Sequence, residues 1–529
     1  MQLVKKTIYE CLADRIECEP DKIFLKYGDS GFTESEIGNI VEKVAKLLYT
    51  DGVRPKDSIG IYGINSASWI ILFLAIQRIG AVAVLVNSYF KEGELVDCIL
   101  MSDMKYLLYT DIQEDDAHGE VAKKIQANEK TSHVKCFDIE GTYEYWKSLV
   151  EKKTECDSLE LPKQPDPMDT ACILFTSGTT NMCKGVKLSH YSLINNASEM
   201  ARVMGWNKDD IMCVAVPLFH CFGITLGIIA SLIVGNSIVL LQKYKSISVC
   251  EAIQNNRCTI LNGVPSMFLA MVRNKRFSEF DLSSLKSGII AGSPILKDEY
   301  LSVCEKIKGI MLQPAYGLTE TSPCVAMCSL DVPLEKKAVT SGKVISNVDV
   351  KIVNNDTGEE CSPGEAGEIF VRGYNVTQGY LSTDPVVCDA LMPDGWFKTG
   401  DIAYFDEEGF LYIVGRRKNL IIRGGENISP TEIERYIKQV KENMEVFVYG
   451  MKSEVLQEEI VACIEGKKDD ILEKKIREYL SDNISKYKIP KFIVFIDEFP
   501  RNPTGKIDEK NLKKMVNDML KQTSLYITR

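Results

Sequence analysis

The sequence predicts an α/β protein with a large N-terminal domain of packed mixed sheets and helices that includes a β subdomain, followed by a small α+β C-terminal domain. Strand-like and helix-like segments alternate through the first third of the chain, which predicts a mainly parallel sheet covered by helices. Short strands separated by turn residues fill residues 342–413, and the alternation of helix and strand resumes after residue 418. Because single cores stop growing at roughly 250–300 residues, a chain of 529 residues needs at least two domains. We place them at residues 1–417 and 418–529.

The composition is typical of a soluble globular protein, with 45% hydrophobic and 26% charged residues. The net charge of −11 disfavours nucleic acid as a partner. Because the protein as a whole is negative, any anionic cofactor must bind at a local positive site. The 17 cysteines are odd in number and form no Cys-x-x-Cys pair, and there are only four histidines. This pattern argues against a disulfide framework and a structural zinc site. The first residues lack the apolar core of a signal peptide, and we therefore expect a cytoplasmic protein.

The first elements follow from local signals. Residues 21–26 are expected to form a strand, and Thr33 with Glu36 forms a capping box that starts a helix. Apolar residues then recur on one face of that helix, at Ile37, Val41, Val44 and Leu48. Residues 58–64 are strand-like, a helix begins at Ser66, and residues 81–86 form a buried strand.

The secondary structure of two later stretches, residues 111–167 and 223–241, is less directly indicated by the sequence. Residues 111–167 are polar and proline-containing, and we interpret them as surface helix and linker. Residues 223–241 are long and uncharged enough for a membrane span, but Gly235-Asn236-Ser237 is a turn signal. We favour a buried helix followed by a short strand, residues 238–241, and expect no membrane span.

The last third carries the β subdomain and the C-terminal domain. Residues 348–353, 368–372 and 410–414 are expected to be strands, because turns rich in Gly, Asn and Asp separate them. Ser429 followed by Pro430 predicts a helix start in the C-terminal domain.

The most informative motif is Phe-Thr-Ser-Gly-Thr-Thr-Asn-Met-Cys-Lys-Gly at residues 175–185, directly after an apolar strand. Glycine lets backbone N–H groups approach an anion, hydroxyls add donors, and Lys184 supplies positive charge, so the loop predicts a polyphosphate site. The spacing differs from the Walker pattern. A flexible hydroxyl-rich surface turn is the alternative from the residues alone.

This motif resembles the signature of the adenylate-forming superfamily, which includes acyl-CoA synthetases, and five further segments in the family's order extend the resemblance over nearly the whole chain. In that family the loop holds the β- and γ-phosphates of ATP. The residues matched to it are Thr176, Ser177, Gly178, Thr179, Thr180 and Lys184.

The segment at residues 217–223, Pro-Leu-Phe-His-Cys-Phe-Gly, resembles the part of coenzyme A ligases that lines the acyl pocket. The resemblance implies that His220, Phe222 and Gly223, together with Ala315, bind the acid substrate. Taken alone, a histidine such as His220 is more often a satisfied core residue than a functional one, but within this motif we favour a role in the pocket.

The segment at residues 315–321, Ala-Tyr-Gly-Leu-Thr-Glu-Thr, resembles the family's Tyr-Gly-x-Thr-Glu motif. By that match Tyr316 stacks on adenine, Thr319 contacts the α-phosphate, and Glu320 binds Mg²⁺, with Thr179 as a second ligand. The remaining nucleotide-binding residues implied by the resemblance are Ala315, Gly317, Gly292 and Ser293. From the residues alone, a helix start with a Thr-Glu cap is the alternative.

The family assigns further roles near the end of the chain. Asp401 and Arg416 match residues that bind the ribose hydroxyls, and Lys418 matches the hinge between the domains. Gly424 and Gly425 match a segment that borders the pantetheine tunnel after the C-terminal domain rotates. Lys506, in a Pro-x-x-x-x-Gly-Lys loop, matches the catalytic lysine that bridges the carboxylate and the α-phosphate. The resemblance therefore gives Lys506, Glu320, Thr319 and Lys184 as the catalytic residues.

The chain departs from the family at Asn181 and Cys183, where glycine and proline are usual. Three interpretations follow: an acyl-CoA synthetase using ATP, Mg²⁺, coenzyme A and a carboxylic acid; a ligase that loads the phosphopantetheine of a carrier protein; and a nucleotide-binding homologue without turnover. We favour the first with a fatty or other apolar acid. His220 lies where amino-acid-activating domains carry aspartate, and Ile224, Leu226, Ile228 and Ile229 are apolar.

Overall fold

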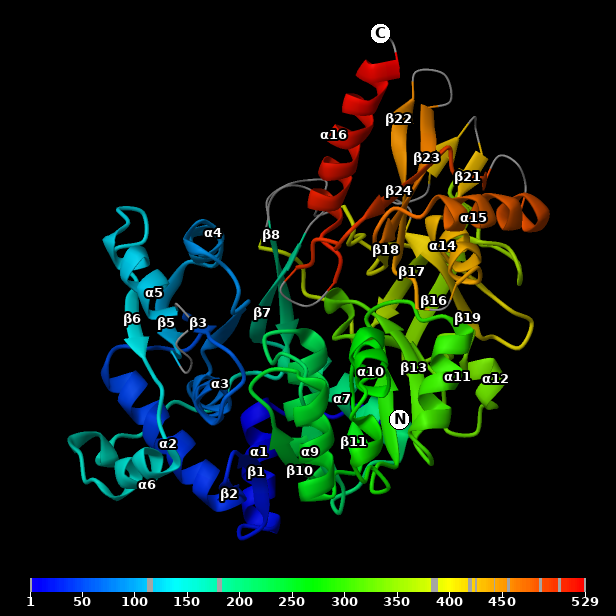
Figure 1. The fold of residues 1–529 in the computed structure, drawn as a ribbon. Coiled ribbons are helices and arrows are strands. Elements are labelled where there is room, and N and C mark those ends of the chain that lie inside the picture. The colour runs from blue at the N-terminus through cyan, green and yellow to red at the C-terminus, as the bar shows by residue number, and fades with distance from the viewer. Residues whose placement is uncertain are drawn as a thin grey trace. The chain divides into compact units, whose positions relative to one another are not determined.

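The computed structural model describes residues 2–111, 118–177, 183–381, 389–416, 421–423, 426–441, 443–453, 457–484, 488–502 and 506–527. The chain forms two compact units, Met1–Val350 with Val371–Lys398, and Lys351–Phe370 with Thr399–Arg529. Each combines sheets and helices (Figure 1), which confirms the predicted α/β fold class. The boundary expected at residues 417/418 lies outside the described residues and stays a prediction.

The first sheet of the first unit has the strand order β6-β5-β3-β4-β7-β8, parallel except for the final antiparallel pair. Its strands are β3 (Ser58–Tyr62), β4 (Val82–Val86), β5 (Met104–Tyr109), β6 (Lys135–Asp138), β7 (Thr170–Ser177) and β8 (Cys183–Ser189). The helices within this stretch are α3 (Ala67–Ile79), α4 (Glu92–Ser102), α5 (His118–Ala127), α6 (Tyr143–Glu151) and the 3₁₀ turn η1 (Glu155–Ser158). One core cluster joins strands of this sheet to α4 and α5.

The second sheet has the order β15-β14-β13-β12-β11-β9-β10-β1-β2, and the run from β13 to β1 is parallel. Its strands are β1 (Ile23–Tyr27), β2 (Ser30–Thr33), β9 (Ile211–Val214), β10 (Ser237–Leu240), β11 (Ile260–Leu261), β12 (Ser287–Ile290), β13 (Met311–Gly317), β14 (Cys324–Met327) and β15 (Lys343–Val344). The carboxyl ends of β9, β11, β12 and β13 therefore share one edge, the usual location of ligand sites in such sheets.

The remaining helices of the first unit flank these strands in sequence. They are α1 (Ile8–Cys18), α2 (Glu34–Thr50), α7 (His190–Met204), the π-helical η2 (Gly223–Ile229), α8 (Ala230–Val234), α9 (Ser246–Asn256), α10 (Pro265–Val272), η3 (Phe277–Glu279), α11 (Lys297–Lys306), η4 (Thr319–Thr321) and α12 (Leu334–Lys337). Helices α9, α10 and α11 contribute to a core cluster with the second sheet.

Several local predictions are confirmed. Thr33 and Glu36 form the expected capping box at the start of α2. Residues 223–241 divide into helix and strand at Gly235, which has a φ of +80°. Among the helices of the described ranges, none combines the length and apolar character needed to cross a membrane.

One expectation needs correction: residues 111–167, interpreted as surface helix and linker, also contain strand β6. This strand lies at the sheet edge, where three of its four residues are exposed. Exposed edge positions have no apolar alternation, so the usual signal for a strand was absent.

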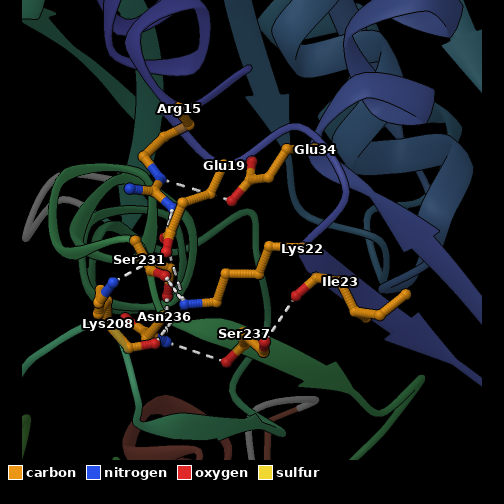
Figure 2. Close-up of polar contacts among 10 residues, drawn as sticks. Arg15, Glu19, Lys22, Ile23, Glu34, Lys208, Ser231, Asn236 and Ser237 are labelled. Carbon is orange, nitrogen blue, oxygen red and sulfur yellow. Dashed lines mark hydrogen bonds and ion pairs between the residues drawn. The ribbon is translucent and has the colours of Figure 1, made fainter. Parts of the chain in front are cut away.

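The end of α1 is anchored by a charged cluster that reaches the turn between α8 and β10 (Figure 2). An Nη of Arg15 donates to Glu19 at 2.8 Å, and its Nε lies 3.5 Å from Oε1 of Glu34. Lys22 donates to the carbonyl of Gly235 at 2.7 Å. The Glu34 carboxyl is buried, and neither of its oxygens accepts a hydrogen bond from any residue that the structure describes. Burial raises the pKa of Glu34 to about 7, although the charge of Arg15 opposes this shift.

A further sheet joins β16 (Val348–Val353), β17 (Gly367–Gly373), β18 (Phe397–Phe405) and β19 (Leu411–Arg416) in that order. The three strands expected in this region are confirmed as β16, β17 and β19. Strands β18 and β19 are antiparallel, and Asp401 is paired with Arg416.

The last sheet has the order β21-β20-β23-β22, with β24 also paired to β23. Its strands are β20 (Ile421–Arg423), β21 (Glu426–Ile428), β22 (Val446–Ser453), β23 (Gln457–Glu465) and β24 (Phe492–Ile496). One core cluster packs helices α14 (Pro430–Lys438) and α15 (Asp470–Asn483) on this sheet, and another packs α16 (Glu509–Ile527) on it. Ser429 is the N-cap of α14, as expected.

Candidate active site

The predicted polyphosphate loop connects two antiparallel strands. Strand β7 enters it and β8 leaves it, with Thr176 directly opposite Lys184 in the register and Ser177 opposite Cys183. Gly178, Thr179 and Thr180 lie outside the described residues, as does Asn181. The hairpin thus presents the hydroxyl of Thr176 and the ammonium of Lys184 from neighbouring strands at the base of this loop.

Lys184 and Glu320 meet on the same tyrosine. The Nζ of Lys184 lies 5.5 Å from the centroid of the Tyr380 ring, and the Tyr380 hydroxyl donates to Oε1 of Glu320 at 3.0 Å. Two of the predicted catalytic residues, far apart in sequence, are therefore brought together. Tyr380 itself was not anticipated from the sequence, because the signal for it is a long-range contact rather than a local motif.

The turn that carries Thr319 and Glu320 is fixed by its own hydrogen bonds. Buried Thr321 accepts from the Leu318 amide at 3.0 Å and donates to the carbonyl of Pro323 at 2.6 Å. Gly317 is required where the chain leaves β13, because an added Cβ would come within 1.8 Å of the Pro323 oxygen. The Glu320 side chain is consequently held at the end of β13.

The segments matched to adenine lie at the carboxyl ends of adjacent strands. Ala315 and Tyr316 are the last residues of β13 before Gly317, and both are half-buried. Gly292 follows the neighbouring strand β12 and has a φ of +90°, a conformation that favours glycine. Ser293 is exposed beside it. The geometry brings these four residues to one sheet edge, as a nucleotide base site requires.

His220 lies at the same edge, after β9. Its amide donates to the Pro217 carbonyl at 3.2 Å, and its carbonyl accepts from Ile224 at 3.0 Å. Gly223 is needed here because a Cβ would lie 2.0 Å from the Pro217 oxygen. The half-buried His220 ring packs on Phe219 with a centroid distance of 4.5 Å.

Phe222, half-buried, immediately precedes η2. Its neighbour Cys221 is buried, and burial raises the pKa of the Cys221 thiol to about 12. A thiol so hard to ionise is a poor nucleophile at neutral pH, even beside a histidine. The pair Cys221–His220 therefore gives no support to covalent catalysis.

A narrow crevice lies at the end of β11, beside α10, and it has no room for a water-sized group. It is lined by Tyr244, Leu261, Asn262, Gly263, Met267, Phe268 and Met271. The Asn262 side chain is already occupied, accepting from the Ile289 amide at 2.9 Å. The lining is therefore apolar in character.

In the second unit, Asp401 and Arg416 form an ion pair of 2.9 Å between Oδ1 and Nε. The Asp401 side chain is 6% exposed, whereas that of Arg416 is 60% exposed. Each carboxylate oxygen can accept more than one hydrogen bond, so a carboxylate in an ion pair can also accept from hydroxyl groups. The two residues matched to the ribose are thus brought together.

Lys506 precedes Ile507, which forms an antiparallel bridge with Arg501. The Lys506 amide donates to Oδ1 of Asn502 at 3.0 Å, and its carbonyl accepts from the Asn502 amide at 2.7 Å. Lys418, Gly424 and Gly425 lie outside the described residues, so their roles stay predictions.

The oxygen donors of the first unit suit a Mg²⁺ ion that is held jointly by the protein and by substrate phosphates, rather than one enclosed by protein side chains. Within the described ranges, no three His, Cys, Asp or Glu side chains gather in the manner of a metal site. Mg²⁺ is usually held by one or two carboxylates together with substrate phosphates and water. The Glu320 carboxylate, with Oε1 fixed by Tyr380, suits that arrangement.

Comparison with known proteins gives matches over both units. Residues 12–381 match the family model described as AMP-binding enzyme, and residues 432–506 match that described as AMP-binding enzyme C-terminal domain. The chain is 31% identical over 546 residues to "Putative acyl-CoA synthetase YngI" of Bacillus subtilis (strain 168), covering 99% of each. It is also 31% identical over 544 residues to the human mitochondrial medium-chain acyl-CoA ligase ACSF2, covering 97% of this chain and 88% of that one.

Two solved structures extend the likeness to the fold. The complex of o-succinylbenzoate CoA synthetase (MenE) of Bacillus subtilis with its acyl-adenylate intermediate aligns with a TM-score of 0.83 at 27% identity, over 97% of this chain and 99% of that one. ATP-bound MatB of Rhodopseudomonas palustris aligns with a TM-score of 0.86 at 24% identity, over 98% and 100% of the two chains.

Proposed function

The chain belongs to the AMP-binding enzyme family of the adenylate-forming superfamily, and from this membership we propose the substrate and the residue roles of its reaction. It is an AMP-forming acid–CoA ligase that uses ATP and coenzyme A. The finer proposal is that it activates a carboxylic acid with an apolar tail as an acyl-adenylate and transfers the acyl group to the coenzyme A thiol.

The observation that carries the proposal is the arrangement of Lys184, Tyr380 and Glu320. A lysine at the base of a hydroxyl-rich loop supplies the charge for a terminal phosphate, and the nearby carboxylate supplies a hard oxygen ligand. Glu320 would hold Mg²⁺, with Thr179 as a proposed second ligand. When bound, the metal would neutralise phosphate charge as a Lewis acid.

In the first step, a carboxylate oxygen of the acid attacks the α-phosphorus of ATP, and the bond to the β-phosphate oxygen breaks. Acyl-adenylate and pyrophosphate result. Both reactants are anionic, so catalysis consists chiefly of neutralising charge and positioning the groups. We assign Lys184 to the β- and γ-phosphates, Thr319 to the α-phosphate, and Lys506 to the charge that builds between carboxylate and phosphorus.

In the second step, the sulfur of coenzyme A attacks the acyl carbon and its proton is released to solvent, while AMP leaves with the bonding electron pair of the mixed anhydride. No enzyme nucleophile is required, in agreement with the high pKa of Cys221. We propose that Lys418 is the hinge about which the C-terminal domain rotates between the steps, replacing Lys506 by Gly424 and Gly425. Asp401 and Arg416 would bind the ribose in both steps.

The apolar acid is supported by the residues near His220 and by the name of one relative. Ile224, Leu226, Ile228 and Ile229 are all buried in η2. The human relative is named for medium-chain acids. The cysteines whose side chains the structure describes form no disulfides, which is compatible with the proposed reducing compartment.

The experiment is a panel of aliphatic acids of graded length and of aryl acids, each supplied with ATP and Mg²⁺. Pyrophosphate and thioester are measured with coenzyme A, with a holo carrier protein, and with neither. We expect thioester formation with coenzyme A, greatest for an apolar aliphatic acid. Preference for an aryl acid would overturn the substrate proposal, and transfer only to the carrier protein would overturn the acceptor.

A further inference from the structure

The segment that follows β17 ties the phosphate hairpin to the Glu320 turn. The Thr377 amide donates to the carbonyl of Glu320 at 2.8 Å. The same segment runs along β8, where Lys187 donates to Gly379 at 3.0 Å and Leu381 donates to Gly185 at 2.8 Å. Residues 377–381 thus connect two parts of the chain that carry predicted catalytic side chains, through these backbone hydrogen bonds and through the Thr377 hydroxyl, which donates to the Lys187 carbonyl at 2.7 Å.

Within this segment, the side chain of Tyr380 also connects β8 to the turn that carries Glu320. Its backbone forms an antiparallel bridge with Val186, so the strand register fixes the position of its Cα beside β8. From there its hydroxyl reaches Glu320 Oε1 at 3.0 Å, and its ring lies 5.5 Å from Lys184 Nζ. The side chain is half-buried, which limits competition from water for both contacts.

We propose that Tyr380 is a positioning residue for the nucleotide: its hydroxyl orients the Glu320 carboxylate for the metal of MgATP, and its ring holds Lys184 at the base of the phosphate loop. This inference rests on the proposed function, since it assumes that Glu320 and Lys184 serve ATP. It assigns two separable tasks to one side chain, one polar and one aromatic.

The polar task follows from hydrogen-bond geometry. A hydroxyl that donates to one carboxylate oxygen restricts rotation of the group, while the second oxygen and the remaining lone pairs can still bind a cation. Groups that orient a metal ligand in this way typically change metal affinity about 10–100-fold when they are removed. Loss of the hydroxyl should therefore weaken only the magnesium-dependent part of nucleotide binding.

The aromatic task follows from the quadrupole of the ring. A lysine ammonium within about 6 Å of an aromatic centroid is attracted to the ring face. Lys184 is thereby kept near the loop before a phosphate arrives, which reduces the conformational entropy lost on binding. Loss of the ring should weaken nucleotide binding whether or not magnesium is present.

The test compares Tyr380→Phe, Tyr380→Leu and the control Tyr374→Phe. Tyr374 lies on the same segment, but its hydroxyl faces the Asn195 carbonyl at 3.5 Å. Binding of ATP is measured by calorimetry without acid or coenzyme A, once with Mg²⁺ and once with EDTA. This readout does not depend on turnover, and circular dichroism establishes that each variant is folded.

Tyr380→Phe is expected to bind MgATP about tenfold more weakly than the parent and to match it in EDTA. Tyr380→Leu should bind ATP more weakly than the parent both with Mg²⁺ and in EDTA. Tyr374→Phe should bind ATP as tightly as the parent under both conditions. If Tyr380→Phe bound MgATP as tightly as the parent, the proposed role of the hydroxyl would be overturned. Failure of the parent to bind MgATP would instead count against the proposed function.

Discussion

Asp401 and Arg416 face each other across strands β18 and β19, with Arg416 Nε 2.9 Å from Asp401 Oδ1. The aspartate is almost completely buried, while the arginine is largely exposed. The pair therefore fixes the orientation of the Asp401 carboxylate, and a carboxylate can accept several hydrogen bonds at once, including those from hydroxyl groups of a ligand.

The first prediction concerns this carboxylate. Asp401→Asn should raise KM for ATP about tenfold or more, because hydrogen bonds to a charged group contribute roughly 1.5–3 kcal/mol. KM for the acid should change little. Steady-state kinetics with ATP and with 2′-deoxy-ATP check this, since the variant should discriminate less between them. Asp349→Asn, which removes an exposed ion pair with Arg372, is the control; equal effects of the two substitutions would refute the ribose assignment.

A second prediction uses the close approach at Gly223. In Gly223→Ala the new Cβ would lie 2.0 Å from the Pro217 carbonyl oxygen, so the segment bearing His220 must shift. We expect a loss of roughly 1–3 kcal/mol in stability, as for other overpacked sites, together with a higher KM for the acid. Thermal unfolding and acid titrations measure the two effects.

Gly93→Ala is the matched control, because a Cβ at Gly93 meets nothing within 4 Å. If Gly223→Ala left KM for the acid at the parent value while lowering stability, this segment would be structural rather than substrate-binding.

The third prediction concerns pH and Glu34. The folded-state pKa of about 7 lies above the usual value of 4.5. From pH 4.5 upward the unfolded chain loses this proton first, so stability declines until pH rises through about 7. Glu34→Gln abolishes this penalty and should gain up to about 3 kcal/mol relative to the parent over that window. Urea unfolding at pH 4.5, 6 and 8 measures it, and a pH-independent difference would disprove it.

The fourth prediction separates the two half-reactions. Lys506→Ala should lower the rate of adenylate formation roughly 100-fold or more, the usual effect of removing one group that stabilises transition-state charge. It should spare the reaction of coenzyme A with a supplied acyl-adenylate. Stopped-flow or quench assays of each step test this, with exposed Lys474→Ala as the control. Equal loss of both steps would show that Lys506 does not act selectively in the first.

Local signals made much of the fold predictable. The capping box at Thr33 and the turn at Gly235 are encoded within a few residues, so each could be located from sequence. Strand β6 could not be located from sequence, because its exposed position at the sheet edge imposes no apolar pattern. The positions of Glu320 and Lys184 followed from motif resemblance, whereas Tyr380 depends on strand pairing with β8 that no local pattern reveals.

The most direct test of the account is exchange of labelled pyrophosphate into ATP by the parent protein, measured with and without acid and in the absence of coenzyme A. Reversible formation of an acyl-adenylate predicts exchange that requires the acid and does not require the thiol. Exchange in the absence of acid would contradict an adenylate intermediate. So would the absence of exchange with every acid tested if the coenzyme A thioester still forms.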